Sequence, residues 1–240
     1  MKKLLIISLF MMSLTLLPAI CTEIQEATIA TDVSVNSDIA PDTATIRFTV
    51  ENSGMNIADI KAKNDKIVNT AISEIKKKLT ADESVKTITY RVNSVYSYKE
   101  KIRIFQKYEV TNGFEVKLKD INKVSEIINI ATSNGVKNVG GLNFSLSDGE
   151  KVCNELMAKS IKTAKARAEY LANAAGTSIS KIKSINPYCS QNSTYVQPRY
   201  LTNAMMKASS AMDGAGEAIE SIEPGSINVR AGVNMVYYLK

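Results

Sequence analysis

The sequence predicts an α+β fold, in which one or more antiparallel sheets pack against two long helices and one shorter helix. Three observations lead to this prediction. The stretch Gly149–Gly176 has the periodicity of a long amphipathic helix, and Asn56–Leu79 has the same period. Around these stretches apolar and polar residues alternate, as they do in half-buried strands. The cleanest alternation closes the chain at Ile227–Leu239, and its length favours a central place in an antiparallel sheet.

The long helical stretch is the element against which we expect the strands to pack. Ser147 and Asp148 offer oxygens for its N-cap, and Gly176 is the residue type that ends a helix in the left-handed conformation. Its alanines allow close approach to a sheet. The apolar positions recur at three- and four-residue steps and form one stripe: Cys153, Leu156, Met157, Ile161, Ala164, Ala168, Leu171, Ala172 and Ala175.

Two short strands are predicted at the beginning of the mature chain. Apolar residues alternate over Ile29–Val35 and again over Thr43–Val50. The residues between them, Asn36–Asp42, form a turn region that includes Pro41. Because the two strands flank a short turn, we expect them to pair as an antiparallel hairpin.

A second hairpin, rich in tyrosine, is predicted after the helix Asn56–Leu79. Its strands are Val85–Tyr98 and Ile104–Leu118, joined by a turn at Lys99–Lys101. Tyrosines at alternate positions favour cross-strand packing. The alternative is a platform on which a ligand stacks. The run Lys76–Lys78 suits the last turn of the preceding helix, where cations complement the helix dipole.

The shorter helix is predicted at Asp120–Ser133, followed by a strand at Val139–Leu146 and a weaker one at Ile179–Ile185. Residues 188–221 are then predicted to form a long polar loop that is either partly disordered or contains a short helix near Asn203–Met212. Its methionines, Met205, Met206 and Met212, indicate either a partner-binding or self-association segment or a tolerated surface loop.

Residues 1–21 are typical of a secretory signal peptide. Lys2 and Lys3 precede the apolar run Leu4–Leu17, which is too short for a comfortable membrane span. Ala19 and Cys21 are small residues two positions apart, so cleavage after Cys21 fits. The alternative, lipidation of Cys21, is less favoured because Ile20 before it is not small. By either route we expect an exported protein, and with cleavage near Cys21 we expect it to be periplasmic or secreted.

Removal of the signal peptide simplifies the cysteine content to Cys153 and Cys189. In an oxidising compartment this pair could form a disulfide. The alternative makes Cys153 a buried residue on the helix stripe and Cys189 an unpaired loop thiol. We favour unpaired thiols, because Cys153 lies early on the helix and Cys189 lies well beyond its end.

Loss of the signal peptide also removes two lysines, so the formal net charge falls from +6 to +4. This charge does not favour nucleic acid as a partner.

The residue types give little support to catalysis. The chain has no histidine, the usual general base and transition-metal ligand. Gly140 and Gly141 are not flanked by the sequence of a phosphate-binding loop. A carboxylate-dependent hydrolase remains an alternative. Its candidate acids are Asp42, Glu109, Glu115 and Asp148, but no spacing pairs them. The two acids on the hairpin, Glu109 and Glu115, are predicted to be solvated. We therefore predict no catalytic, cofactor-binding or metal-binding residues.

The order of the segments resembles the SIMPL domain family of bacterial envelope proteins, from about Thr28 to the end of the chain. One departure is Asn36–Ser37, where relatives carry glycine in the first turn. The resemblance rests on Pro41–Ala44, on Gly141–Asp148, on Ala164–Glu169 and Ala174–Gly176 within the long helix, and on Ile222–Gly225 before the last strand.

The resemblance implies a single α+β domain over residues 28–240 and an exported, non-catalytic envelope protein without a cofactor. Family members include periplasmic immunogenic proteins, and relatives are linked to oxidative-stress tolerance. At least one is described as a ring-like oligomer. We therefore expect a homo-oligomer that could also bind an envelope protein or the membrane surface, including that of the outer membrane. The alternative function is a small-ligand binding module that uses the tyrosine-rich hairpin.

Overall fold

The computed structural model describes residues 26–192, 194–196 and 222–240. The signal peptide and Cys21 lie outside these residues, as do Met205, Met206 and Met212 with the predicted short helix. The elements in chain order are β1 (Thr28–Ile39), β2 (Thr43–Gly54), α1 (Ile57–Lys76), β3 (Ser84–Lys99), β4 (Ile102–Leu118), the 3-10 turn η1 (Ile121–Lys123), α2 (Val124–Ser133), β5 (Asn138–Ser145), α3 (Gly149–Ala174), β6 (Ile179–Gln191), β7 (Thr194–Val196) and β8 (Ile227–Leu239).

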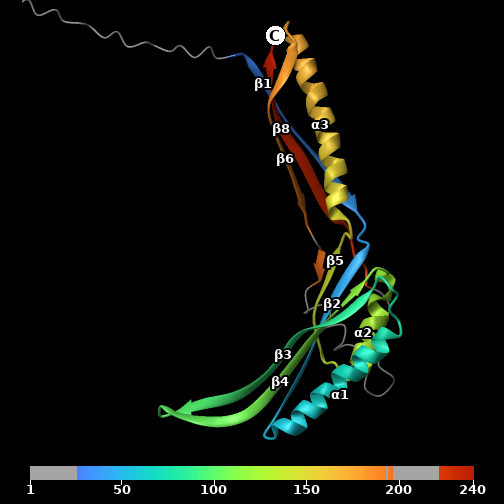
Figure 1. Ribbon diagram of the computed structural model, residues 1–240, viewed down its shortest axis with the longest axis vertical. Helices are drawn as coiled ribbons and strands as arrows, with labels where there is room; N and C mark the ends of the chain where they lie inside the picture. The colour runs from blue at the N-terminus through green and yellow to red at the C-terminus, as the bar shows by residue number, and fades with distance from the viewer. Residues whose placement is uncertain (1–25, 193, 197–221) are drawn as a thin grey trace, which may run out of the picture.

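The strands form two antiparallel sheets. One has three strands in the order β1-β8-β6, and the other has five in the order β3-β4-β2-β5-β7. Helix α3 packs along the first sheet, which together we call the three-stranded unit; α1 and α2 pack on the second, the five-stranded unit. Figure 1 shows the two units end to end along the long axis of the molecule. The α+β prediction is confirmed, and β8 takes the central place expected of it.

The predicted hairpin between the first two strands is wrong. β1 pairs with β8, with Val33 opposite Val233, and β2 lies between β4 and β5 in the other sheet. The connection at residues 40–42 therefore carries the chain from one sheet to the other. Alternation located both strands, but β1 continues to Ile39 through part of the predicted turn, and all twelve of its residues pair with β8.

The buried side chains form two clusters, one in each unit, and not one interior shared by all the helices and strands. The larger cluster lies in the five-stranded unit, where the rings of Phe48 and Phe114 stack with centroids 5.0 Å apart. The smaller cluster, between α3 and its sheet, contains Val33, Ala164, Ala168, Val233, Met235 and Tyr237. The domain boundaries themselves stay a prediction.

Helix α3 is confirmed, and the side chain of Asp148 accepts a hydrogen bond from the Lys151 N–H as its cap. Its buried face is narrower than the predicted stripe and consists of Ser160, Ala164, Ala168 and Ala172. Leu171, placed on that stripe, is 43 % exposed, and Ala175 is exposed as well. The helix therefore contacts the sheet through small residues.

Strand β6 is longer than predicted and runs to Gln191, and β7 adds three residues to the five-stranded sheet. The predicted polar loop at 188–221 is therefore wrong over its first residues. Pro187 interrupts the pattern, but β6 is an edge strand, where a missing backbone N–H is tolerated. The rest of the loop lies outside the described residues.

Candidate functional site

The β3–β4 hairpin is confirmed, and its end projects from the five-stranded sheet. Glu100 and Lys101 form its turn with φ of 50° and 68°, the positive values that a tight two-residue hairpin turn requires. Pairing of β4 with β2 ends where Gly54 lies opposite Tyr108. Beyond that point residues 95–107 form a two-stranded ribbon, which we call the arm (Figure 1).

The arm carries an aromatic cluster that nothing in the described chain covers completely. The ring of Phe105 lies 5.7 Å from that of Tyr96 and 4.8 Å from that of Tyr108. The Arg103 guanidinium lies 3.5 Å from the centre of the Tyr96 ring. These contacts are the cross-strand packing expected of the tyrosines. However, Tyr98 is 73 % exposed and Ile102 is 65 % exposed, and such apolar exposure marks an interaction surface.

The acids proposed for hydrolase chemistry lie in separate settings. Asp42 accepts hydrogen bonds from the Ser147 N–H at 2.6 Å and the Ser147 hydroxyl at 2.7 Å. Burial works to raise the pKa of Asp42, but the bonds from Ser147 outweigh it and lower that pKa. The contact ties the β1–β2 connection to the β5–α3 connection. Asp42 therefore joins the two units, while Asp148 caps α3.

The prediction that Glu115 is merely solvated is wrong. Its side chain is only 12 % exposed and pairs with Arg47 at 2.9 Å and with Lys86 at 3.0 Å. Although burial opposes ionisation, these two cations lower the pKa of Glu115. Glu109 lies on the same strand, opposite Asn93 and Ser53. A general acid near neutral pH needs a raised pKa, so neither Asp42 nor Glu115 fits that role.

Sequence reasoning missed Glu83, whose side chain is fully buried. Its carboxylate accepts hydrogen bonds from the backbone N–H groups of Thr80, Lys119 and Asp120, and pairs with the Lys123 ammonium at 3.0 Å. Burial opposes ionisation, but these donors lower the pKa of Glu83 to about 2. Glu83 thus joins the loop before β3 to the turn after β4. A single acid in a polar loop gives no periodic signal of this role.

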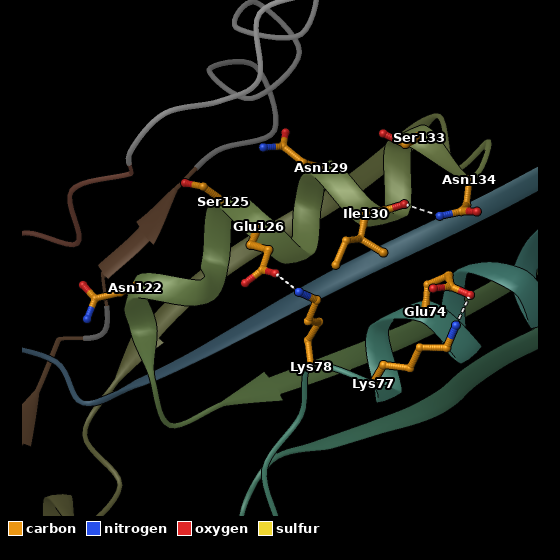
Figure 2. Close-up of a pocket in the computed structure, with 10 residues that line it drawn as sticks. All are labelled: Glu74, Lys77, Lys78, Asn122, Ser125, Glu126, Asn129, Ile130, Ser133 and Asn134. Atoms are coloured by element: carbon orange, nitrogen blue, oxygen red, sulfur yellow. Dashed lines mark hydrogen bonds and ion pairs between the residues drawn. The ribbon is translucent and has the colours of Figure 1, made fainter.

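A groove of about 610 Å³ lies between the end of α1 and α2 (Figure 2). Lys78 pairs with Glu126 across it at 2.7 Å, and Lys77 pairs with Glu74 at 2.6 Å. These side chains are 41 % to 63 % exposed. The lysine run is therefore an exposed helix end, as predicted. Because two lysines face two glutamates, the charges of the groove cancel, and its lining offers no charged group left to act on a ligand.

The preference for unpaired thiols is wrong, because Cys153 and Cys189 form a disulfide with Cα atoms 5.8 Å apart. The geometry follows from element lengths. From Cys153 to Ala174 the helix rises about 32 Å, at roughly 1.5 Å per residue. From Ile179 to Cys189 the returning strand spans about 33 Å, at roughly 3.3 Å per residue. The return of β6 along α3 therefore brings Cys189 level with Cys153.

In the described part of the chain, no group of three metal-ligating side chains is close enough together to hold a metal ion. None of the helices described is sufficiently long and apolar to span a membrane.

The fold and its surfaces define an elongated α+β protein built from two helix-covered antiparallel sheets, with an exposed aromatic arm. The chain belongs to the SIMPL family, described as "Protein of unknown function (DUF541)", whose model matches residues 29–237. It is similar to the 26 kDa periplasmic immunogenic proteins of Brucella melitensis biotype 1 and Brucella abortus strain S19. Each is 22 % identical over 233 residues, covering 93 % of this chain and 91 % of the relative.

Proposed function

We propose that this chain is a non-catalytic, exported protein of the cell envelope that self-assembles through its arm. The observation that carries the proposal is the exposed aromatic cluster on a ribbon that extends beyond its own sheet. A two-stranded ribbon is marginally stable in water by itself. A second copy packed on the arm would bury its tyrosines and isoleucines and stabilise the ribbon.

The backbone of β3 supports the same proposal. This strand is sixteen residues long and is the outermost strand of its sheet. Long open edges pair readily with another strand, and natural proteins usually cover or shorten them. The arm also holds four cations and one carboxylate, so its partner surface should not be strongly basic.

Light scattering coupled to size-exclusion chromatography tests the proposal on the mature chain, residues 22–240. We expect a mass of several copies for the parent protein and a monomer for the double variant Tyr98→Ser/Ile102→Ser. Tyr170→Ser is the matched control, because Tyr170 is 74 % exposed but lies on α3 in the other unit. A parent protein that stays monomeric at its highest soluble concentration would exclude self-assembly.

The proposed location is the periplasm, after cleavage behind Cys21. The support is the signal-like composition of residues 1–21 and the names of the periplasmic relatives. Mass spectrometry of the protein from a fractionated host tests this. A mature chain that begins at Thr22 in the soluble fraction is expected, whereas an acylated Cys21 in the membrane fraction would replace cleavage by lipid anchoring.

A role in oxidative-stress tolerance is proposed as a consequence of this envelope location. Survival of a deletion strain under peroxide, compared with a strain complemented by the parent gene, tests it. Equal survival would end the proposal.

The alternative function, a small-ligand module on the arm, is favoured by the Arg103–Tyr96 stack, which resembles how aromatic surfaces hold cationic groups. Native mass spectrometry of protein taken from its host would detect a retained molecule.

A further inference from the structure

The second face of the five-stranded sheet carries a polar hollow that is separate from the arm. Helices α1 and α2 cover one face of this sheet (Figure 1). The hollow, of about 390 Å³, opens on the other face, because its lining residues alternate along β2 and β4 with core residues such as Ile46 and Val116. We propose that it binds the phosphate group of a small phosphate ester. The hollow is lined by Thr45, Arg47, Lys86, Glu115, Lys117, Gly140, Gly141, Asn143 and Ser145.

The strand register brings these residues together from four strands. Lys86, Glu115, Arg47 and Gly141 form one row across β3, β4, β2 and β5. Lys117, Thr45 and Asn143 form the next row. Because alternate residues of a strand share a face, both rows point to the open side of the sheet.

Glu115 sits between Arg47 and Lys86 and fixes both cations. Its Oε2 accepts from Arg47 Nε at 2.9 Å, and its Oε1 pairs with Lys86 Nζ at 3.0 Å. The two cations remain 63 % and 66 % exposed, whereas Glu115 is 12 % exposed. The described hydrogen bond of Arg47 uses Nε, so its Nη atoms are available to a planar or tetrahedral oxyanion. The cations are therefore held in place before a ligand arrives.

The charge of the hollow fits a dianion. Arg47, Lys86 and Lys117 supply three positive charges against the one carboxylate of Glu115, and Lys117 makes no ion pair with any residue the structure describes. A phosphate monoester carries a charge between about −1.5 and −2 at neutral pH and has three acceptor oxygens. The hydroxyl and amide groups of Thr45, Ser145 and Asn143 beside the cations could bond the hydroxyls of the esterified part.

Glycine keeps the floor of the hollow open. The pairing of β2 with β5 shifts at Arg47, which leaves Gly140 as the extra residue of a bulge. A Cβ on Gly140 would lie 3.7 Å from the Arg47 carbonyl oxygen and 3.9 Å from Thr49 Oγ1, both ordinary contacts. Packing therefore does not require glycine there. A larger side chain at this position would extend from the lining of the hollow and occupy part of its volume.

Calorimetric titration of the mature protein with glycerol 3-phosphate and glucose 6-phosphate tests the proposal. We expect saturable binding of the esters and none of glucose. Lys117→Gln should weaken binding by about tenfold or more, because it removes a charged donor. Gly140→Leu should also weaken it, by occupying the space. Lys162→Gln, an equal charge change on exposed α3, and the arm variant Tyr98→Ser/Ile102→Ser should bind as the parent protein does.

Vesicles distinguish a soluble ester from a lipid headgroup of the same chemistry. If phosphatidylcholine vesicles that contain phosphatidic acid, whose headgroup is a phosphate monoester, retain the parent protein but not Lys117→Gln, while vesicles of phosphatidylcholine alone retain neither, the phosphate belongs to a membrane surface. If only the soluble esters bind, it belongs to a small molecule. The proposal is overturned if none of these phosphate probes binds, or if Lys162→Gln loses as much affinity as Lys117→Gln.

Discussion

The two units solve the packing of helix on sheet in different ways. In the five-stranded unit, Phe48, Phe114 and Phe144 fill the space beneath α1 and α2. In the three-stranded unit, the buried residues of α3 are alanine and serine, and the larger buried side chains, such as Met235 and Tyr237, come from the sheet. Packing of large apolar side chains stabilises the first unit. The second unit buries fewer apolar side chains, and small cores commonly need additional links.

The additional links of the three-stranded unit are polar and covalent. Ser160 Oγ lies 2.9 Å from the Leu156 carbonyl of its own helix and 3.3 Å from the Ala231 carbonyl, so its one proton is shared between helix and sheet. Thr31 donates to the Ala164 carbonyl at 3.4 Å. The two bonds between helix and sheet are buried and join α3 directly to the sheet. The disulfide adds a covalent link at the N-terminal end of α3. The three-stranded unit therefore depends on specific bonds, whereas the five-stranded unit depends on apolar packing, so the two units should be destabilised by different changes.

The largest expected effect is loss of the disulfide. A closed loop of 36 residues should stabilise the protein by about 4 kcal/mol in the chain-entropy model, and measured values are often lower. In Cys153→Ala/Cys189→Ala, urea unfolding should start at lower concentration. Hydrogen exchange should accelerate in α3 and β6 and stay unchanged in α1 and α2. Faster exchange throughout the molecule would mean that the two units unfold together.

Low pH should destabilise the five-stranded unit by protonating Glu83. Its folded pKa of about 2 lies below the ordinary value of 4.5, so its contribution to stability is complete above pH 4.5. As pH falls toward 2, that contribution is lost, by about 3 kcal/mol in total at roughly 1.4 kcal/mol per pKa unit.

Urea unfolding at a series of pH values, followed by far-ultraviolet circular dichroism, measures this effect. Glu83→Gln should be markedly less stable than the parent protein at pH 7 and close to it near pH 2. Glu100→Gln, an acid in the turn of the arm, should follow the parent protein at every pH. If the Glu83→Gln curve ran parallel to the parent curve, the pH dependence would have to come from other carboxylates.

Local periodicity was sufficient for the elements but not for their partners. The helix α3, the strand β8 and the β3–β4 hairpin follow from patterns within single stretches. The partner of β1 does not, because Val33 pairs with Val233, far along the chain. Alternation states which face of a strand is buried and leaves its neighbour undetermined. The assignment of β1 and β2 to one hairpin failed for this reason.

The disulfide was missed because β6 seemed to end early. With a strand that ended at Ile185, Cys189 fell in a loop, and the match of helix and strand lengths was lost. The two candidate surfaces, the arm and the hollow, also differ in how much of them the sequence shows. Tyrosines of the arm are visible in the sequence, but their exposure depends on β2 ending at Gly54. The hollow around Glu115 joins four strands, so only the register shows it.

The smallest expected effect tests the close contact beneath α3. Ala168 is fully buried against the sheet, so Ala168→Leu forces extra atoms into a space sized for a methyl group. We expect a loss of about 1–3 kcal/mol in the free energy of unfolding. Ala166→Leu is the matched control, because Ala166 lies on the exposed side of the same helix, and this change should alter stability little. Because the five-stranded unit is packed with large side chains, it should keep its hydrogen-exchange protection in Ala168→Leu. An Ala168→Leu protein as stable as the control would show that α3 can move away from its sheet at little cost, and that small residues are not what holds this unit together.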